Sequence, residues 1–338
     1  MNTAACERIV VLNKRDLVPE WGVEPFRNAM SKKFPDQRII SASWQRPRDI
    51  RKLSELLVNI ARKHPHAMEL NVLVIGMPNV GKSTLLNSLR NMGIKGRTPK
   101  AFQTGAQPGL TKALSTRLKV SLEPLVYAFD TPGVMLPYLG RGEEGAERGV
   151  KLALIAGIKE GLYDMEALAS YLLYRLNVLN PISPAYLQLL SKGAVPTVDL
   201  QDFLEQLARR MGMIMRGAEL DTARAAAYFV RWWREEGGLI AASSSPLQFV
   251  ETSGSDICHP PMQGWGFDFQ WQLGAEDRFV TKEEESSFIQ NRMEACIDDY
   301  LVAIDREDNE ELNVSPTQIK KQQVKEEKLR RKQKQLKR

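Results

Sequence analysis

The stretch Gly76-Met77-Pro78-Asn79-Val80-Gly81-Lys82-Ser83-Thr84 decides how this chain of 338 residues folds. An apolar run at 72–75 precedes it and Leu85-Leu86-Asn87-Ser88-Leu89 follows it, so the order is strand, glycine loop and helix. The glycines let successive backbone N–H groups turn inward, and the helix start adds its positive dipole end. The pattern is typical of a loop that holds phosphate groups, with Lys82 supplying a positive charge and Ser83 placed to ligate Mg²⁺.

A second stretch adds the groups that a phosphate and metal site needs. Residues 125–129 read as a buried strand that ends in Asp130-Thr131-Pro132-Gly133. This arrangement brings the Asp130 carboxylate near the metal and the Gly133 N–H near a γ-phosphate. We expect the polar region that begins at residue 93 to contain the first switch, with the Thr111 hydroxyl and backbone meeting Mg²⁺ and the γ-phosphate.

Two upstream stretches identify the base. Residues 9–12 read as a strand that ends in Asn13-Lys14-Arg15-Asp16. In a guanine site the Asp16 carboxylate accepts two hydrogen bonds that adenine cannot offer, while Asn13 braces the loop and the Lys14 stem covers the ring face. A strand-like run at 38–40 then delivers Ser41-Ala42-Ser43, where we expect a backbone N–H to meet the guanine O6.

The order of these motifs predicts the fold class. The base-reading motifs come before the phosphate loop, whereas small GTPases have the reverse order. This order resembles that of the circularly permuted GTPases, and the resemblance extends from the first strand to about residue 175. We therefore expect an α/β fold, a P-loop NTPase sheet with circularly permuted GTPase motifs, followed by a C-terminal helical domain.

Within that group the chain is most similar to the ribosome-assembly GTPases, which include bacterial ribosome biogenesis GTPase A and mitochondrial GTPase 1. The matching stretches are 76–83, Pro108-Gly109-Leu110-Thr111-Lys112, 130–137 and 149–159. The motifs and the resemblance together predict a set of GTP or GDP contacts: Asn13, Lys14, Asp16, Ser41, Ala42, Asn79, Val80, Gly81, Lys82, Ser83, Thr84, Thr111 and Gly133. The predicted Mg²⁺ ligands are Ser83, Thr111 and Asp130.

The sequence assigns no catalytic residue. Val134 follows Gly133 where Ras-type enzymes carry a Gln, and an apolar side chain cannot orient water. The resemblance implies a slow intrinsic rate, acceleration by a ribosomal partner, and a K⁺ ion held with the help of Asn79. The relatives carry a first strand and a histidine before the base motif. Because neither has a counterpart here, we expect a truncated chain with an unpaired sheet edge.

The hydrophobic periodicity divides the chain into parts. We expect a permuted GTPase domain at 1–161, a helical accessory domain at 162–240, a Ser/Gly/Pro-rich linker or insertion at 241–275, a helical segment at 276–312 and a basic tail at 313–338. In the accessory domain, the aromatic group Tyr228, Phe229, Trp232 and Trp233 has the spacing of core residues rather than of a base-stacking platform.

Charge and composition limit the alternatives. The net charge is +6, but residues 316–338 hold ten Lys or Arg against two Glu, so the rest of the chain sums to −2. Such a tail favours contact with RNA phosphates, although a solubility tail, nuclear import or an anionic membrane surface remain alternatives. The three cysteines have no metal-ligand or disulfide spacing. No apolar run approaches the roughly 20 residues of a membrane span.

The sequence thus predicts a GTP-hydrolysing assembly factor for a large ribosomal subunit and its rRNA. We expect a mitochondrial address, in the matrix or peripheral to the inner membrane, and no DNA partner. Two alternatives stay open. One is a truncated, catalytically impaired module that binds RNA or the ribosome in a GTP-dependent way, and the other is a nucleolar or cytosolic assembly GTPase of the same permuted group.

Overall fold

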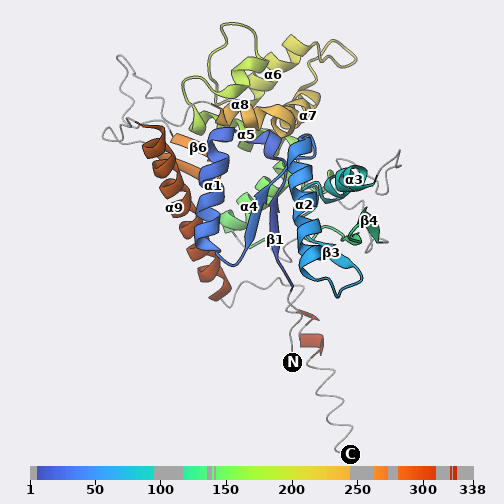
Figure 1. Ribbon diagram of the computed structural model, residues 1–338. Coiled ribbons are helices and arrows are strands. Elements are labelled where there is room, and N and C mark those ends of the chain that lie inside the picture. The colour runs from blue at the N-terminus through green and yellow to red at the C-terminus, as the bar shows by residue number, and fades with distance from the viewer. Residues whose placement is uncertain are drawn as a thin grey trace, which may run out of the picture.

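The computed structural model describes residues 6–94, 117–134, 139–140, 142–243, 262–272, 281–309, 320–321 and 323–325. The nucleotide-binding part alternates strands and helices (Figure 1): β1 (Ile9–Leu12), α1 (Glu20–Lys33), β2 (Arg38–Ser41), α2 (Pro47–Lys63), β3 (Leu70–Val74), α3 (Lys82–Gly93), β4 (Leu118–Ser121) and β5 (Val126–Asp130). The remainder is mainly helical: α4 (Gly142–Leu154), α5 (Met165–Leu179), α6 (Leu200–Met211), α7 (Thr222–Trp232), α8 (Gly238–Ala242), the hairpin of β6 (Met262–Gly266) and β7 (Phe269–Gln272), and α9 (Lys282–Asn309).

Short 3₁₀- and π-helical turns connect some of these elements. Arg15–Leu17 and Ala185–Leu189 are 3₁₀ turns, and Trp233–Gly237 is a π-helical turn that leads from α7 into α8. The first of them directly follows β1, and it therefore carries the end of the Asn13-Lys14-Arg15-Asp16 motif.

The strands form two separate sheets in this half of the molecule. β1 pairs with β2 in parallel, with Ile9 opposite Arg38 and Leu12 opposite Ser41. β3 pairs with β5 in parallel, with Leu70 opposite Val126, and β4 adds to β5 in the antiparallel direction. The α/β fold with permuted motifs is confirmed, but in the described residues one edge of β1 and one edge of β3 carry no partner strand.

Helices α2 and α3 cover one face of both sheets with apolar side chains. α2 is strongly amphipathic, and Ile50, Leu53 and Leu57 on its inner face are each no more than 5% exposed. They join Leu86 and Leu89 of α3 and two residues of β5, Val126 and Ala128, in one apolar core. Since this core also contacts β1 and β3, α2 bridges the two sheets and fixes the distance between the motifs that follow them.

The helical region has its own core. Tyr186, Phe203 and Phe229 are fully buried and meet edge to face, with ring centroids 4.6–6.5 Å apart. Asp164, Asp199 and Asp221 cap the N-termini of α5, α6 and α7 by accepting hydrogen bonds from backbone N–H groups. The buried positions of Phe229 and Trp232 agree with the packing interpretation of the aromatic group.

The predicted Ser/Gly/Pro-rich linker or insertion at 241–275 contains regular structure at residues 262–272. These residues form the β6–β7 hairpin, whose Trp265 and Phe269 pack against Phe26 of α1. Trp271 is 5% exposed and shares an apolar cluster with Met293 of α9. Helix α9 lies along α1 (Figure 1). Aromatic side chains therefore attach the hairpin and α9 to the nucleotide-binding part, and hydrophobic periodicity does not predict this contact.

Candidate functional site

The phosphate loop lies between β3 and α3, as the sequence predicts. Asn79 and Gly81 adopt left-handed backbone conformations with φ of 58° and 87°, so the chain turns sharply before α3 begins at Lys82. The Lys82 ammonium donates to the Gly76 carbonyl at 2.9 Å and to the Met77 carbonyl at 2.8 Å. Burial lowers the pKa of Lys82, and the nearby Asp130 carboxylate opposes this effect.

Ser83 and Asp130 are the two predicted Mg²⁺ ligands that lie in the described residues. Asp130 ends β5, is fully buried, and accepts a hydrogen bond from the Ser83 hydroxyl. A hydroxyl and a carboxylate from adjacent elements are the oxygen donors that Mg²⁺ takes beside nucleotide phosphates. The residues present therefore fit a Mg²⁺ ion that is completed by phosphates and water. The third predicted ligand, Thr111, lies outside the described residues.

Gly133 lies against the phosphate loop. A Cβ atom added to Gly133 would come within 2.6 Å of the Pro78 side chain and 2.9 Å of its Cα, so only glycine permits this approach. The next residue, Val134, donates its N–H to the Gly76 carbonyl at 3.1 Å, while its side chain is 55% exposed. The backbone after β5 is thus tied to the start of the loop, and an apolar side chain occupies the position of a water-orienting Gln.

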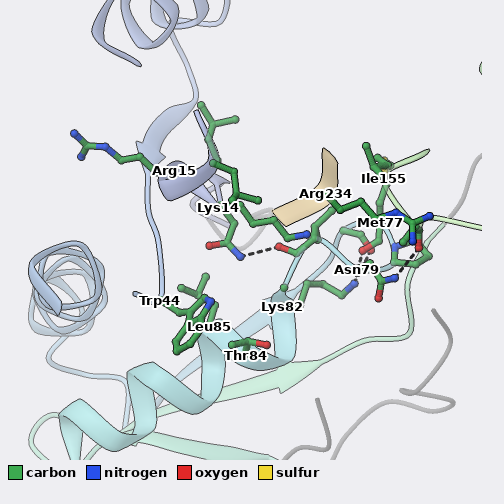
Figure 2. A pocket seen from close by; sticks show the side chains of 18 of the residues that line it. Lys14, Arg15, Trp44, Met77, Asn79, Lys82, Thr84, Leu85, Ile155 and Arg234 are labelled. Atoms are coloured by element: carbon green, nitrogen blue, oxygen red, sulfur yellow. Dashed lines mark hydrogen bonds between the residues drawn. The ribbon is translucent and has the colours of Figure 1, made fainter. Parts of the chain in front are cut away.

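The base-reading motif reaches the phosphate loop through Asn13. The Asn13 amide Nδ2 donates to the Val80 carbonyl at 2.7 Å. Lys14 is in the left-handed region at φ 60°, and its side chain lines the pocket (Figure 2). Asp16 accepts a hydrogen bond from the Ser43 hydroxyl, which orients its carboxylate. The fully buried Ser43 was not among the predicted site residues, and adjacency to Ala42 is the only signal for it.

The Ala42 backbone is hydrogen-bonded within the protein. That N–H donates to the Leu12 carbonyl at 2.9 Å, and the Ala42 carbonyl accepts from the Arg15 N–H at 3.1 Å. Ser41 itself is the last residue of β2, paired with Leu12. Ala42 therefore holds the two base-reading loops together through its backbone, and the contact of a backbone N–H in residues 41–43 with a guanine O6 stays a prediction.

A cavity of about 1760 Å³ includes these residues. It is lined by both base-reading loops, by the phosphate loop and, from the helical region, by Tyr228, Trp233 and Arg234. Burial lowers the pKa of Lys14; Asp16 acts in the opposite direction, and the Arg234 guanidinium adds a smaller lowering. The pocket is therefore positively charged at two lysines and has room for a nucleotide.

Arg234 and Ala156 are site residues that sequence reasoning missed. Asn79 donates its side-chain amide to the Ala156 carbonyl at 2.6 Å, and Arg234 donates to the carbonyls of Leu154 and Ala153 at 2.8 and 2.9 Å. Arg234 thus binds the C-terminal end of α4, where carbonyls lack helical partners, beside the residue that Asn79 contacts (Figure 2). No sequence pattern predicts that Arg234, in a π-helical turn, contacts the end of α4 beside the phosphate loop.

The described ranges contain no cluster of three or more His, Cys, Asp or Glu side chains arranged to hold a metal ion. None of the helices in the part of the chain that the structure describes has the length and apolar character needed to cross a bilayer.

The fold and the site define a P-loop GTPase domain in circularly permuted order. Residues 71–183 match the model of the 50S ribosome-binding GTPase family, which covers about a third of the chain. The match includes the phosphate loop, Asp130 and Gly133 but begins after the base-reading motifs, which come first in this chain.

The resemblance to the ribosome-assembly GTPases, including mitochondrial GTPase 1, is confirmed. The chain is 38% identical over 161 residues to mitochondrial ribosome-associated GTPase 1 of Xenopus tropicalis, covering 47% of this chain and 49% of that one. It is 36% identical over 146 residues to mitochondrial GTPase 1 of Schizosaccharomyces pombe, covering 43% and 41%. The chain thus spans about half or less of the length of these relatives. A crystal structure of YlqF from T. maritima has a TM-score of 0.43 at 20% identity, covering 69% of this chain and 78% of that one.

Proposed function

We propose that this chain binds and hydrolyses GTP and assists the assembly of the large subunit of the mitochondrial ribosome. The observation that carries the proposal is the hydrogen bond from Asn13 to Val80, because it brings a guanine-reading motif and a phosphate loop to one pocket. The names of the similar proteins, which are ribosome-associated and mitochondrial, support the ribosomal and mitochondrial parts.

Each group in the pocket has a chemical task in this proposal. Asp16 reads the guanine edge while Ser43 fixes its carboxylate, and Lys82 leaves the loop carbonyls to bind phosphate oxygens. Ser83 and Asp130 hold Mg²⁺, which neutralises charge on the phosphates. Thr111 remains a predicted third ligand. Because Val134 is apolar and exposed, it supplies no water-orienting group, and we expect slow turnover without a partner.

A monovalent cation is the second element of the proposal. Asn79 is the predicted K⁺ ligand, and its amide faces the Ala156 carbonyl at 2.6 Å. The Asn79 Oδ1 is a neutral oxygen donor of the kind that a K⁺ ion takes, and the ion would place positive charge where charge develops in the transition state.

The remaining parts concern partners and address. We propose that the helical region and the basic residues 313–338 hold rRNA, since ten Lys or Arg in residues 316–338 release counterions when they meet phosphates. We propose a mitochondrial matrix location. The same basic residues would also allow peripheral contact with the anionic surface of the inner membrane.

The test measures GTP turnover by the purified chain in K⁺ and in Na⁺, with and without mitochondrial large subunits. Under the proposal, the chain binds GTP, large subunits accelerate turnover, and K⁺ supports a higher rate than Na⁺. The Lys82→Ala variant is the matched control and should lose the stimulated rate. GTP-dependent binding to large subunits without any turnover would instead identify a binding module, and an equal rate in K⁺ and Na⁺ would remove the cation from the mechanism.

A further inference from the structure

Trp44 differs from the other tryptophans of the chain. The chain has six tryptophans, and all of them lie in the described residues. Five of them contact another aromatic ring, namely Trp21, Trp232, Trp233, Trp265 and Trp271. Trp44 has no ring contact among the described residues, and it is 51% exposed. A large aromatic ring is therefore open to a ligand at this position.

Trp44 lies at the base-reading end of the cavity. Its side chain lines the cavity, as that of Lys14 does (Figure 2). The residue before it, Ser43, donates its hydroxyl to the Asp16 carboxylate, and the Ala42 carbonyl accepts from the backbone N–H of the residue before Asp16. Trp44 is thus attached to the turn that carries the predicted guanine-reading carboxylate, and not to the phosphate loop.

Hydrogen bonds fix the backbone around Trp44. The fully buried Ser43 accepts from the Gln45 N–H at its hydroxyl and from the Arg46 N–H at its carbonyl, each at 3.1 Å. Pro47 then begins α2 with a φ angle that its own ring restricts. Because this turn is already ordered, Trp44 loses little backbone freedom when it contacts a ligand, and this favours binding.

We propose that the Trp44 indole packs against the purine ring of the bound guanine nucleotide. Aromatic side chains stack on nucleobases because every base has a π-face, so the contact adds affinity without distinguishing one purine from another. In this arrangement Asp16 selects guanine, and Trp44 strengthens the binding of any purine that enters the pocket. The inference rests on the proposed function, because it requires a nucleotide in this cavity.

The test measures binding of GDP, inosine diphosphate and inorganic pyrophosphate to the full chain by calorimetry in Mg²⁺. Trp44→Ala should weaken GDP binding by about 5- to 150-fold, the range for loss of one base–aromatic contact. Inosine diphosphate keeps the purine ring but lacks the 2-amino group that Asp16 is predicted to bind, so Trp44→Ala should weaken it by the same factor. Pyrophosphate has no ring, and its affinity should not change. Trp44→Phe keeps an aromatic ring and should lose less affinity than Trp44→Ala.

Gln45→Ala is the matched control. Gln45 is exposed on the same turn, lies outside the cavity lining, and keeps its backbone bond to Ser43 when its side chain is removed. It should bind all three ligands as the parent does, and both alanine variants should melt close to the parent because the changed side chains are exposed.

Tryptophan emission gives a second readout that does not depend on affinity. Saturating GDP should quench the emission of the parent, because a guanine stacked on an indole quenches it, and should quench Trp44→Phe much less. Equal quenching in the two proteins, unchanged GDP affinity in Trp44→Ala, or an equal loss of pyrophosphate binding would overturn the inference. A changed preference between GDP and inosine diphosphate in Trp44→Ala would also overturn it, because the variant would then act by displacing Asp16.

The same data separate this inference from the proposed function. GDP binding that requires Lys82 but is insensitive to Trp44 would remove the stacking contact and leave the proposed function intact. A parent chain that binds no GDP would overturn the proposed function, and the inference with it.

Discussion

Asn13 and Val80 are 67 positions apart in sequence, yet the Asn13 amide donates to the Val80 carbonyl at 2.7 Å. This contact joins the loop that is predicted to read the base to the loop that is predicted to hold the phosphates. A Cβ atom on the adjacent Gly81 would lie 2.6 Å from the same Asn13 Nδ2. The glycine of the phosphate loop is therefore required both by its left-handed backbone and by the base-reading side chain beside it.

The first prediction separates these two requirements. Gly81→Ala places a side chain at φ 87° and also displaces Asn13, whereas Gly212→Ala has φ 65° and no atom within 4 Å of the new Cβ. Both variants should lose about 1–2 kcal/mol of stability from the left-handed backbone. Gly81→Ala should lose more stability than Gly212→Ala because its new Cβ atom also displaces Asn13. Only Gly81→Ala should weaken nucleotide binding. Chemical denaturation and fluorescent GDP titration measure the two effects.

Asn13→Ala completes a double-mutant cycle with Gly81→Ala. Alone, Asn13→Ala removes the hydrogen bond to Val80 and costs about 0.5–1.5 kcal/mol. In the Gly81→Ala background, Asn13→Ala also removes the clash with the new Cβ atom. The stability lost by the double variant should therefore be smaller than the sum of the losses of the two single variants. Strict additivity would show that the loops do not contact each other in solution.

Lys82→Ala tests the phosphate loop. The Lys82 ammonium donates to the Gly76 and Met77 carbonyls, so its removal leaves only backbone N–H groups to hold phosphates. A charge-assisted hydrogen bond contributes about 1.5–3 kcal/mol, which predicts about 10- to 150-fold weaker GDP binding by calorimetry. Lys52→Ala, on the exposed face of α2, is the control. Unchanged affinity in Lys82→Ala would reject the assignment of the loop.

Asp16→Asn tests the choice of base. The Asp16 carboxylate accepts two hydrogen bonds from guanine, whereas an Asn amide donates one and therefore complements a base with a carbonyl at C2. We expect GTP binding to weaken by about 10- to 100-fold and xanthosine triphosphate binding to strengthen, because one charge-assisted hydrogen bond is exchanged. Competition binding of the two nucleotides measures the ratio. Asp36→Asn, at an exposed position, should retain the original preference.

The sequence predicts the strands and loops of the nucleotide site because each motif is local. A strand, a glycine loop and a helix at 72–89, and an Asp at the end of β5, are each specified by neighbours in the chain. The roles of the individual nucleotide contacts stay predictions, since these depend on the ligand.

Other features could not be predicted because they depend on contacts distant in sequence. The β6–β7 hairpin lies in a Ser-, Gly- and Pro-rich region, and its place against α1 is set by Trp265, which contacts Phe26 and donates its indole N–H to the Pro19 carbonyl at 3.2 Å. Likewise, Arg234 lies 80 residues from the Leu154 carbonyl that it binds. Nothing in the local pattern distinguishes these side chains from other aromatic or basic residues.

Gly22 offers a test of the hairpin's position. A Cβ atom on Gly22 of α1 would lie 2.2 Å from the Trp265 indole nitrogen, although Ala is the better helix former. Gly22→Ala should therefore destabilise the protein by about 1–3 kcal/mol through overpacking. In a Trp265→Ala background the same change should stabilise it by about 0.5–1 kcal/mol, as for Ala in an open helix position. The same sign in both backgrounds, measured by urea denaturation, would contradict the packing of Trp265 on α1.

Glu294 predicts a pH dependence for the attachment of α9 to α1. Its carboxylate accepts from the Lys32 ammonium at 2.6 Å and from Gln290 at 2.9 Å, and these bonds lower the pKa of Glu294. A carboxyl whose pKa is lowered by folding stabilises the native state above its ordinary pKa of about 4.3, and this contribution is lost as the pH falls through the lowered value. Because Lys32 is 63% exposed, the contribution at neutral pH should be below about 1 kcal/mol.

Glu294→Gln should therefore lower the free energy of unfolding at pH 7 by that small amount, and the difference from the parent should shrink as the pH falls below about 4. Glu283→Gln changes an exposed carboxyl at the start of the same helix and is the matched control. Urea denaturation at several pH values measures both. A Glu294→Gln deficit that stays constant down to pH 3 would mean that lost packing, and not the ion pair with Lys32, accounts for the effect.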